Sequence, residues 1–288
     1  MIDESAVDKR ISPAEQMLRA HGQEHYFRAG QSALECIQKA LDAASISPQR
    51  IKRVLDLPCG HGRVLRYLKA ALPTAEITAC DLLRDGVDFC SSMLGATALY
   101  SCDEPEDIPL EPGSFDLIWV GSLFTHLDSA LWPRFLAVFR NALCPGGVLV
   151  FTTHGRNAYQ FLIGGTYHSL SHRQETLLAY RYERTGFSYT KYSGSESYYG
   201  HSQSHPAWVI HQLTAVGGLR LVNLSENAWD QHQDVFTCIR DPACEGDIRR
   251  TARVRYLRHM ALNRMNPWLR SALEDIWERL FKRRAVCD

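Results

Sequence analysis

The sequence lacks several features that would assign it to common protein classes. No apolar run approaches the ~20 residues that a membrane-spanning helix requires. The first ten residues are charged and contain no apolar stretch, so we expect no secretory signal there. No Cys-x-x-Cys pair occurs among the nine cysteines, most of which fall inside apolar runs. This pattern indicates small core residues in a reducing compartment, so we expect a cytoplasmic protein.

An excess of charge is lacking as well, since 32 Lys and Arg balance 32 Asp and Glu. The distribution is uneven, because residues 249–288 carry eleven Lys and Arg against four Asp and Glu, which leaves the rest mildly acidic. An acidic body argues against nucleic acid as its partner. We expect two helices in the basic tail, over about 247–263 and 268–284. Such a tail suits docking on the body, peripheral contact with an anionic membrane, or homodimerisation.

Residues 53–68 form the most informative stretch of the chain. An apolar segment ends at Asp56, glycines follow at positions 60 and 62, and apolar residues then recur at helical spacing from Val64. Glycine adopts positive φ and leaves the backbone bare, so a ligand can lie against it. The N–H groups at the start of the helix point at the same place. A strand, a glycine turn and a helix in this order are typical of a nucleotide or cofactor site on an open α/β sheet.

Strand and helix patterns continue to alternate along the chain, which is typical of βαβ units around a parallel sheet. We expect strands at 54–57, 77–80, 98–101, 115–120, 148–153, 219–224 and 235–240, and helices at 13–45 (broken at 21–22), 64–72, 87–94, 131–143 and 207–215. The short loop between the last two strands predicts an antiparallel terminal hairpin. Across residues 155–206, which are rich in Tyr, Ser, Gly and His, the alternation stops. An insertion of this length is usually functional.

The predicted fold is therefore α/β, with a Rossmann-like, doubly wound, seven-stranded and mostly parallel sheet. Its domain spans residues 51–240, including the insertion after the fifth strand. Helices in residues 1–50 precede it and are expected to cover the cofactor site, and the basic helical tail occupies residues 241–288.

These segments resemble the class I S-adenosylmethionine-dependent methyltransferases over roughly residues 25–240. Residues 56–62 look like the family's glycine loop, which wraps the methionine end of the cofactor. Asp81 looks like the acid that holds the ribose hydroxyls, and residues 102–104 look like the adenine site. The resemblance implies that S-adenosylmethionine is bound by Tyr26, Arg28, Gly30, Asp56, Pro58, Cys59, Gly60, Gly62, Asp81, Leu82, Asp103, Glu104, Gly121 and Ser122.

Two residues of the loop depart from the family pattern, since Pro58 replaces a frequent first glycine and Arg63 a frequent last one. A nicotinamide-dependent oxidoreductase is the main alternative. It requires Gly-x-Gly-x-x-Gly, and residue 65 is Leu. The residues themselves agree with the family, because a carboxylate at a strand end can accept hydrogen bonds from both hydroxyls of a diol. Asp81 could instead cap a helix, and Asp56 could orient the loop without touching the ligand.

The resemblance implies methyl transfer, which we expect to reach a hydroxyl of a small molecule, sugar or glycan. N-methylation and non-catalytic cofactor binding are the alternatives. The reaction needs alignment and, for a hydroxyl, a base, and it needs no metal. His126 and His154 follow the fourth and fifth strands, and imidazole titrates near neutrality. Tyr199 and His201 belong to an aromatic, hydroxyl-rich segment that suits a polar, ring-shaped acceptor; each histidine could alternatively be structural.

Overall fold

A computed structural model describes residues 4–165, 167, 170–192 and 199–244, and the side chains of residues 19–21 are outside this description. The two helices expected in the basic tail lie outside the described residues. Within these residues, we find no helix with the length and apolar character needed to span a bilayer.

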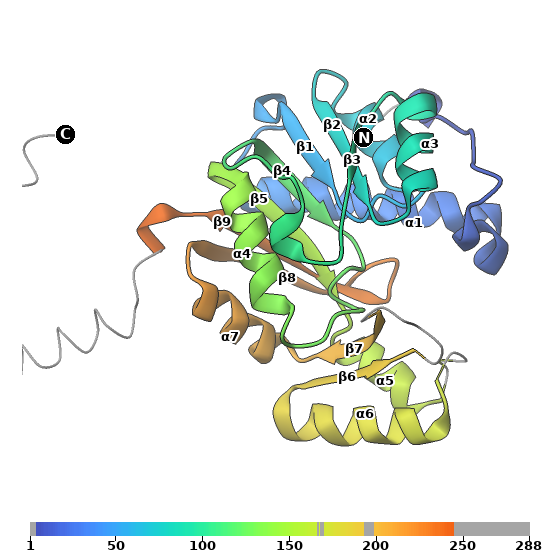
Figure 1. Ribbon diagram of the computed structural model, residues 1–288, viewed down its shortest axis with the longest axis vertical. Helices are drawn as coiled ribbons and strands as arrows, with labels where there is room; N and C mark the ends of the chain where they lie inside the picture. The colour runs from blue at the N-terminus through green and yellow to red at the C-terminus, as the bar shows by residue number, and fades with distance from the viewer. Residues whose placement is uncertain (1–3, 166, 168–169, 193–198, 245–288) are drawn as a thin grey trace, which may run out of the picture. The chain divides into compact units, whose positions relative to one another are not determined.

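The core of the molecule is a seven-stranded sheet in the order β3-β2-β1-β4-β5-β9-β8 (Figure 1). Strands β1 to β5 run parallel, and β9 runs antiparallel to both β5 and β8. The strands are β1 (Arg53–Asp56), β2 (Glu76–Asp81), β3 (Thr97–Tyr100), β4 (Phe115–Val120), β5 (Leu143–Thr153), β8 (Leu219–Trp229) and β9 (Gln233–Arg240). The predicted doubly wound sheet and its terminal hairpin are confirmed.

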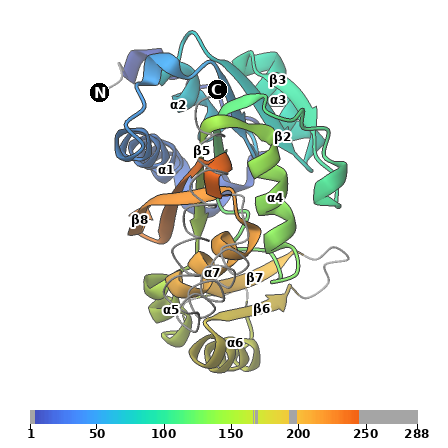
Figure 2. The ribbon, with the colours of Figure 1, turned by 90° about the vertical axis from the view of Figure 1, so that its left-hand side faces the viewer.

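Helices cover both faces of this sheet. The helices of the domain are α1 (Gln16–Ala43), α2 (Leu65–Ala71), α3 (Arg84–Leu94), α4 (Trp132–Ala142) and α7 (Pro206–Val216), with short 3₁₀ turns at Glu4–Ala6, Pro48–Arg50, Pro105–Asp107 and Pro242–Cys244. Apolar side chains of α1, α2 and α3 share one buried cluster with the sheet, and those of α4 and α7 share another. Figure 2 shows α1 and α4 on opposite sides of the sheet. This arrangement explains why residues 117–120 of β4 and 148–151 of β5 are continuously apolar.

The break expected at residues 21–22 is a kink inside α1, where Gly22 has a φ of 81°. The helix begins at Gln16 rather than at residue 13, because the Glu15 carboxylate accepts a hydrogen bond from the N–H of Met17 and caps the helix there. This later start leaves residues 7–15 outside any helix.

The insertion is more regular than its sequence indicated. It contains α5 (Arg156–Ile163), α6 (His172–Thr185), β6 (Phe187–Lys191) and β7 (Gly200–Ser204), which gather at one end of the domain in Figure 1. The strand–helix alternation was expected to stop there, and the structure shows that the insertion has helices and strands of its own. Most side chains of α6 are polar, so the sequence shows no clear helical spacing of apolar residues there. The start of the helix did carry a signal, since Ser171 and Gln174 form a capping box.

Strand β7 attaches the insertion to the carboxyl ends of β4 and β5. The N–H of Gly200 donates to the carbonyl of His126 at 3.1 Å, and that of Ser202 donates to Thr125 at 2.9 Å. The N–H of Ser204 donates to the carbonyl of His154 at 2.9 Å. Three main-chain hydrogen bonds thus place the insertion over the edge of the sheet where ligands bind in open α/β folds.

Candidate functional site

A cavity of about 650 Å³ opens at the carboxyl ends of the parallel strands. The glycine-loop wall, as we name it, consists of residues 57–61, 63 and 64 after β1 and of residues 81–83 at the end of β2. The histidine wall consists of His126, Tyr199 and His232. Other lining residues come from α1 (Glu15, Gln16, Met17, His25 and Ala29), from the loop after β3 (Ser101, Cys102 and Asp103), from β4 and the segments after it (Trp119, Gly121, Ser122, Leu123, Leu127 and Phe135), and from the β8–β9 turn (Trp229, Asp230 and Gln233).

The two glycines of the loop after β1, Gly60 and Gly62, have different structural roles. Gly60, with a φ of 49°, lines the cavity, and a Cβ at this position would meet no atom within 4 Å. Gly62, with a φ of 79°, lies behind the loop, where a Cβ would come within 2.5 Å of Leu94. Gly60 therefore offers bare backbone to a ligand, whereas Gly62 allows the loop to pack on α3.

Asp81 joins the loops that follow β1 and β2. Its Oδ2 accepts a hydrogen bond from the N–H of Gly60 at 2.8 Å, and its Oδ1 accepts one from Leu83 at 2.9 Å. Burial raises the pKa of Asp81, and these backbone donors counteract the rise. Each carboxylate oxygen retains a second lone pair, so Asp81, which lines the cavity, can also accept from the hydroxyls of a ribose.

Asp56 lies beneath this loop and does not line the cavity. Its side chain is buried, and neither carboxylate oxygen has a hydrogen-bond partner among the described residues. Burial, together with the nearby charge of Asp81, raises the pKa of Asp56 well above its usual value. This placement favours the view that Asp56 supports the loop rather than contacting a ligand.

The structure separates the expected cofactor residues into two groups. Those that line the cavity are Pro58, Cys59, Gly60, Asp81, Leu82, Asp103, Gly121 and Ser122. Those that do not are Tyr26, Arg28, Gly30, Asp56, Gly62 and Glu104. Arg28 lines a separate depression on α1, Gly30 packs against Tyr67, and Glu104 pairs with Arg134. The expected residues that reach the cavity thus lie mainly in the loops that follow β1, β2, β3 and β4.

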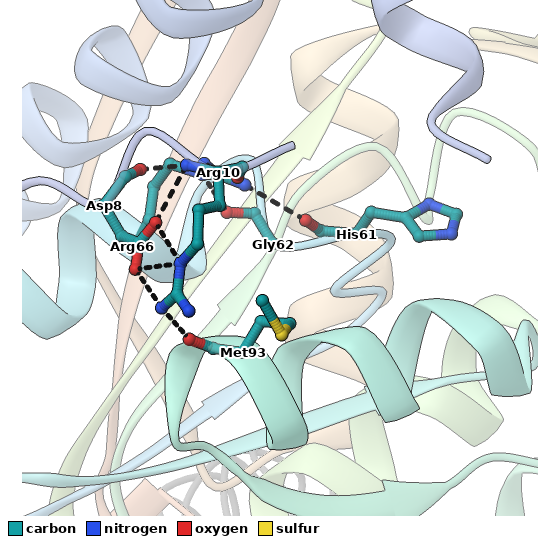
Figure 3. A network of polar contacts seen from close by, with 6 residues as sticks. All are labelled: Asp8, Arg10, His61, Gly62, Arg66 and Met93. Carbon is teal, nitrogen blue, oxygen red and sulfur yellow. Dashed lines mark hydrogen bonds and ion pairs between the residues drawn. The ribbon is translucent and has the colours of Figure 1, made fainter. Parts of the chain in front are cut away.

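A buried guanidinium fixes the glycine loop from behind. Arg66, on α2, donates hydrogen bonds to the carbonyls of Gly62 at 2.9 Å and His61 at 3.3 Å, and to those of Asp8 at 2.8 Å and Arg10 at 2.6 Å (Figure 3). It also donates to the hydroxyl of Tyr26 at 3.2 Å, which explains why Tyr26 faces the interior. The N-terminal segment is thereby fastened to the loop that forms the cavity wall.

His126 has its tautomer fixed by the insertion. Its Nδ1 lies 2.7 Å from the carbonyl oxygen of Gly200, and a carbonyl only accepts, so Nδ1 carries the proton. Burial lowers the pKa of His126 to about 4, and no charged side chain contributes to this shift. The imidazole is therefore neutral near pH 7, with its Nε2 lone pair available, and the ring stacks on Tyr199 at a centroid distance of 4.3 Å.

His154 and His201, the other histidines singled out in the sequence, lie behind the cavity and do not line it. Nδ1 of His154 is 3.1 Å from the carbonyl oxygen of Ser202, and the ring stacks on His201 at 4.8 Å. Burial lowers the pKa of His201 to about 3 and that of His154 well below its usual value. Among the described residues, no three His, Cys, Asp or Glu side chains form a group that could hold a metal.

Several lining residues were not found from the sequence, among them Glu15, Arg63, Trp229, Asp230, His232 and Gln233. Gln233 shows how they act: its amide donates to Ser122 Oγ at 3.1 Å, and its carbonyl accepts from Thr152 Oγ1 at 2.6 Å. Ser122, which has a positive φ of 64°, is thus supported from β5 and β9. Of the lining residues missed from the sequence, Arg63 alone had given a signal there, because it departs from the family's glycine pattern.

Comparisons with known proteins agree with this geometry. Residues 54–147 match a family model described as a methyltransferase domain. The chain is 34% identical over 105 residues to phthiotriol/phenolphthiotriol dimycocerosates methyltransferase 1 of Mycobacterium ulcerans, covering 35% of this chain and 37% of that protein. It is 32% identical over 105 residues to the fatty-acid O-methyltransferase of Mycolicibacterium smegmatis, covering 35% and 36%. In each case the match spans little more than a third of the relative's length.

Among solved structures, the chain is similar to the 1,6-didemethyltoxoflavin-N1-methyltransferase of Burkholderia thailandensis, determined with S-adenosylhomocysteine bound. The TM-score is 0.50 at 13% sequence identity, and the match covers 73% of this chain and 78% of that one. This likeness supports the fold.

Proposed function

Because the chain belongs to the class I S-adenosylmethionine-dependent methyltransferases, we propose that it methylates a hydroxyl oxygen of a small, uncharged acceptor. The observation that carries this proposal is His126, a neutral imidazole whose Nε2 lone pair is available on the cavity wall. A hydroxyl nucleophile needs such an acceptor for its proton.

The residues of the glycine-loop wall fit the family's cofactor. Asp81 offers lone pairs to a ribose diol, and Gly60 leaves room for close approach of a ligand. The apolar side chains of Leu82 and Leu83 are 55% and 52% exposed at the cavity, where an adenine ring would cover them. The bound cofactor supplies a methyl group on a sulfonium, which an in-line nucleophile displaces.

The histidine wall would hold the acceptor in line. The hydrogen bond to Gly200 and the stacked ring of Tyr199 fix the orientation of His126, so that Nε2 can accept the hydroxyl proton. Next to His126, Leu123 and Leu127 add apolar surface. These neighbours suit an acceptor with a hydroxyl on an apolar body.

The lack of charge near His126 favours an uncharged acceptor. No charged side chain shifts its pKa, and Arg63 is the only Lys or Arg among the described residues that line the cavity. A carboxylate acceptor would lose its hydration against the neutral histidine wall, with only the cofactor's sulfonium to offset the cost. The lipids in the names of the relatives support an apolar acceptor. The fatty acid named for one of them carries a carboxylate, which would lie against the neutral side chains around His126.

The experiment compares acceptors and histidine variants. S-adenosylhomocysteine formation is measured with a long-chain alcohol, a phenol, a methyl glycoside and a fatty acid. We expect the alcohol or the phenol to be methylated. His126→Ala should lower turnover by about 10²–10³-fold, with binding of S-adenosylhomocysteine changed less than about twofold.

The matched control is His211→Ala, an exposed histidine on α7, which should leave turnover unchanged. A preference for the fatty acid would contradict the uncharged acceptor, and a preference for the glycoside would contradict the apolar body. If His126→Ala retained full turnover, the assignment of the base would be wrong.

A further inference from the structure

Arg63 occupies an unusual position in the glycine loop, where its backbone is held and its side chain faces the cavity. Its carbonyl oxygen would lie 2.4 Å from a Cβ on Gly30, so α1 packs directly on this part of the loop. The guanidinium carbon lies 5.5 Å from the ring centre of Trp229. That indole is fixed in turn, because its N–H donates to the carbonyl of Ala29 at 2.9 Å. A guanidinium held against an aromatic face keeps its N–H edge available for a ligand.

No hydrogen bond or ion pair joins the Arg63 side chain to another residue in the described part of the chain. The nearby carboxylates have other partners: Glu15 accepts from the N–H of Met17 at 2.8 Å, and Asp230 lies 3.1 Å from Nε2 of His25. Burial lowers the pKa of Arg63, while the charges of Glu15 and Asp230 act to raise it. An enclosed positive charge that lacks a hydrogen-bonded anion is costly, and a planar carboxylate would complete it with two parallel bonds.

We infer that Arg63 binds the carboxylate of an amino-acid group, namely the methionine end of the cofactor, with Glu15 and Asp230 placed to receive its ammonium. The inference rests on the proposed function. An amino-acid zwitterion requires both signs of charge within a few ångströms. Among the described lining residues, Arg63 is the only guanidinium or ammonium group, and both carboxylates act on it electrostatically.

The structure favours Arg63 over Arg28, which the sequence suggested for this role. The Arg28 guanidinium lies 2.9 Å from Nδ1 of His25 and 4.0 Å from Glu24, and it lines a separate depression with Phe27 and Tyr67. It therefore faces away from the cavity that Asp81 and Gly60 share.

The test uses two nucleosides that differ only at this end. S-adenosylhomocysteine carries the amino-acid group, and 5′-methylthioadenosine lacks it. Calorimetry on the full chain should show the wild type binding the first at least about tenfold more tightly. Arg63→Met should weaken the affinity for S-adenosylhomocysteine about 30-fold and keep the affinity for 5′-methylthioadenosine within about twofold of the wild type. Binding of the second nucleoside would also show that the variant is folded.

Arg63→Lys should recover part of the loss, because it restores the charge without the planar fork. Arg220→Met, at an exposed ion pair on β8, is the matched control and should change neither affinity. An equal loss of affinity for both nucleosides in Arg63→Met would overturn this inference but not the proposed function. A loss of affinity for S-adenosylhomocysteine in Arg28→Met instead of Arg63→Met would do the same. A wild type that binds neither nucleoside would overturn the proposed function and this inference with it.

Discussion

The glycine-loop wall and the histidine wall of the cavity are built from different chemistry. The first uses backbone N–H groups, carboxylates and two guanidinium groups, Arg63 within it and Arg66 behind it. The second uses the rings of His126, Tyr199 and His232, and the carbonyl of Gly200 in the insertion orients His126. Under the proposed function, one cavity would combine a polar, charge-matched region for the cofactor with an uncharged region for the acceptor.

The largest effect is expected from Arg66, on which the rigidity of the glycine-loop wall depends. Arg66→Met would remove the side-chain donor from the carbonyls of Gly62, Asp8 and Arg10. We expect the free energy of unfolding to fall by about 3–5 kcal/mol, measured by chemical denaturation. Arg220→Met should change it by less than about 0.5 kcal/mol. Similar values for the two variants would show that the N-terminal segment adds little to this wall.

A smaller effect is expected from Asp81→Asn, which keeps the shape of the side chain. One of its two backbone donors, Gly60 or Leu83, would then face an amide N–H, and the ribose would lose a charged acceptor. Affinity for S-adenosylhomocysteine should fall about 30–100-fold in calorimetry, or about 2–3 kcal/mol. Asp85→Asn, an exposed neighbour, is the control. If Asp81→Asn kept the affinity of the wild type, the charge of this carboxylate would not contribute to ligand binding by the glycine-loop wall.

The smallest effect concerns pH, to which the two walls respond in opposite directions. The pKa of His126 is about 4 in the folded protein, below its ordinary value, so the unfolded chain binds more protons in this window. Acidification from pH 7 to 5.5 therefore costs stability, by about 1 kcal/mol for this residue. Asp81 has a raised pKa, so its stabilising contribution is lost as pH rises through the folded value and regained on acidification.

His126→Gln should flatten the acid side of the stability profile by about that 1 kcal/mol, measured by denaturation at both pH values. The exposed His211→Gln variant should leave the profile unchanged. If His126→Gln and the wild type lost the same stability between pH 7 and 5.5, His126 would titrate normally, and the histidine wall would then not be uncharged at acidic pH.

Local patterns were enough to predict the sheet and the glycine-loop wall. Strand ends, glycine turns and the acid at position 81 can be recognised from a few neighbouring residues. The carboxyl ends of parallel strands then lie along one edge of the sheet, which brings these residues together. The lining role of Arg63 was beyond this reasoning, because Trp229, which holds its side chain, is fixed by Ala29. That contact joins residues far apart in the chain.

The histidine wall was only partly predictable for a similar reason. His126 and His154 both follow strands of the sheet, and nothing local distinguishes them. Strand β7 makes the difference: the carbonyl of Gly200 orients His126 beside the cavity, whereas Ser202 receives His154 behind it. The sequence predicted neither the polar helix α6 nor strand β7, and the residues that distinguish the two histidines lie on β7.

The three contacts by which β7 joins the loops after β4 and β5 have a practical consequence. All three run from main-chain amides to main-chain carbonyls, so they place no demand on which side chains the strand carries. The side chains of the strand are nevertheless buried, and a Cβ at Gly200 would lie 2.3 Å from the carbonyl oxygen of Thr190. A proline at Ser202 or Ser204 would remove one of the three contacts, so the attachment of the insertion can be weakened one hydrogen bond at a time.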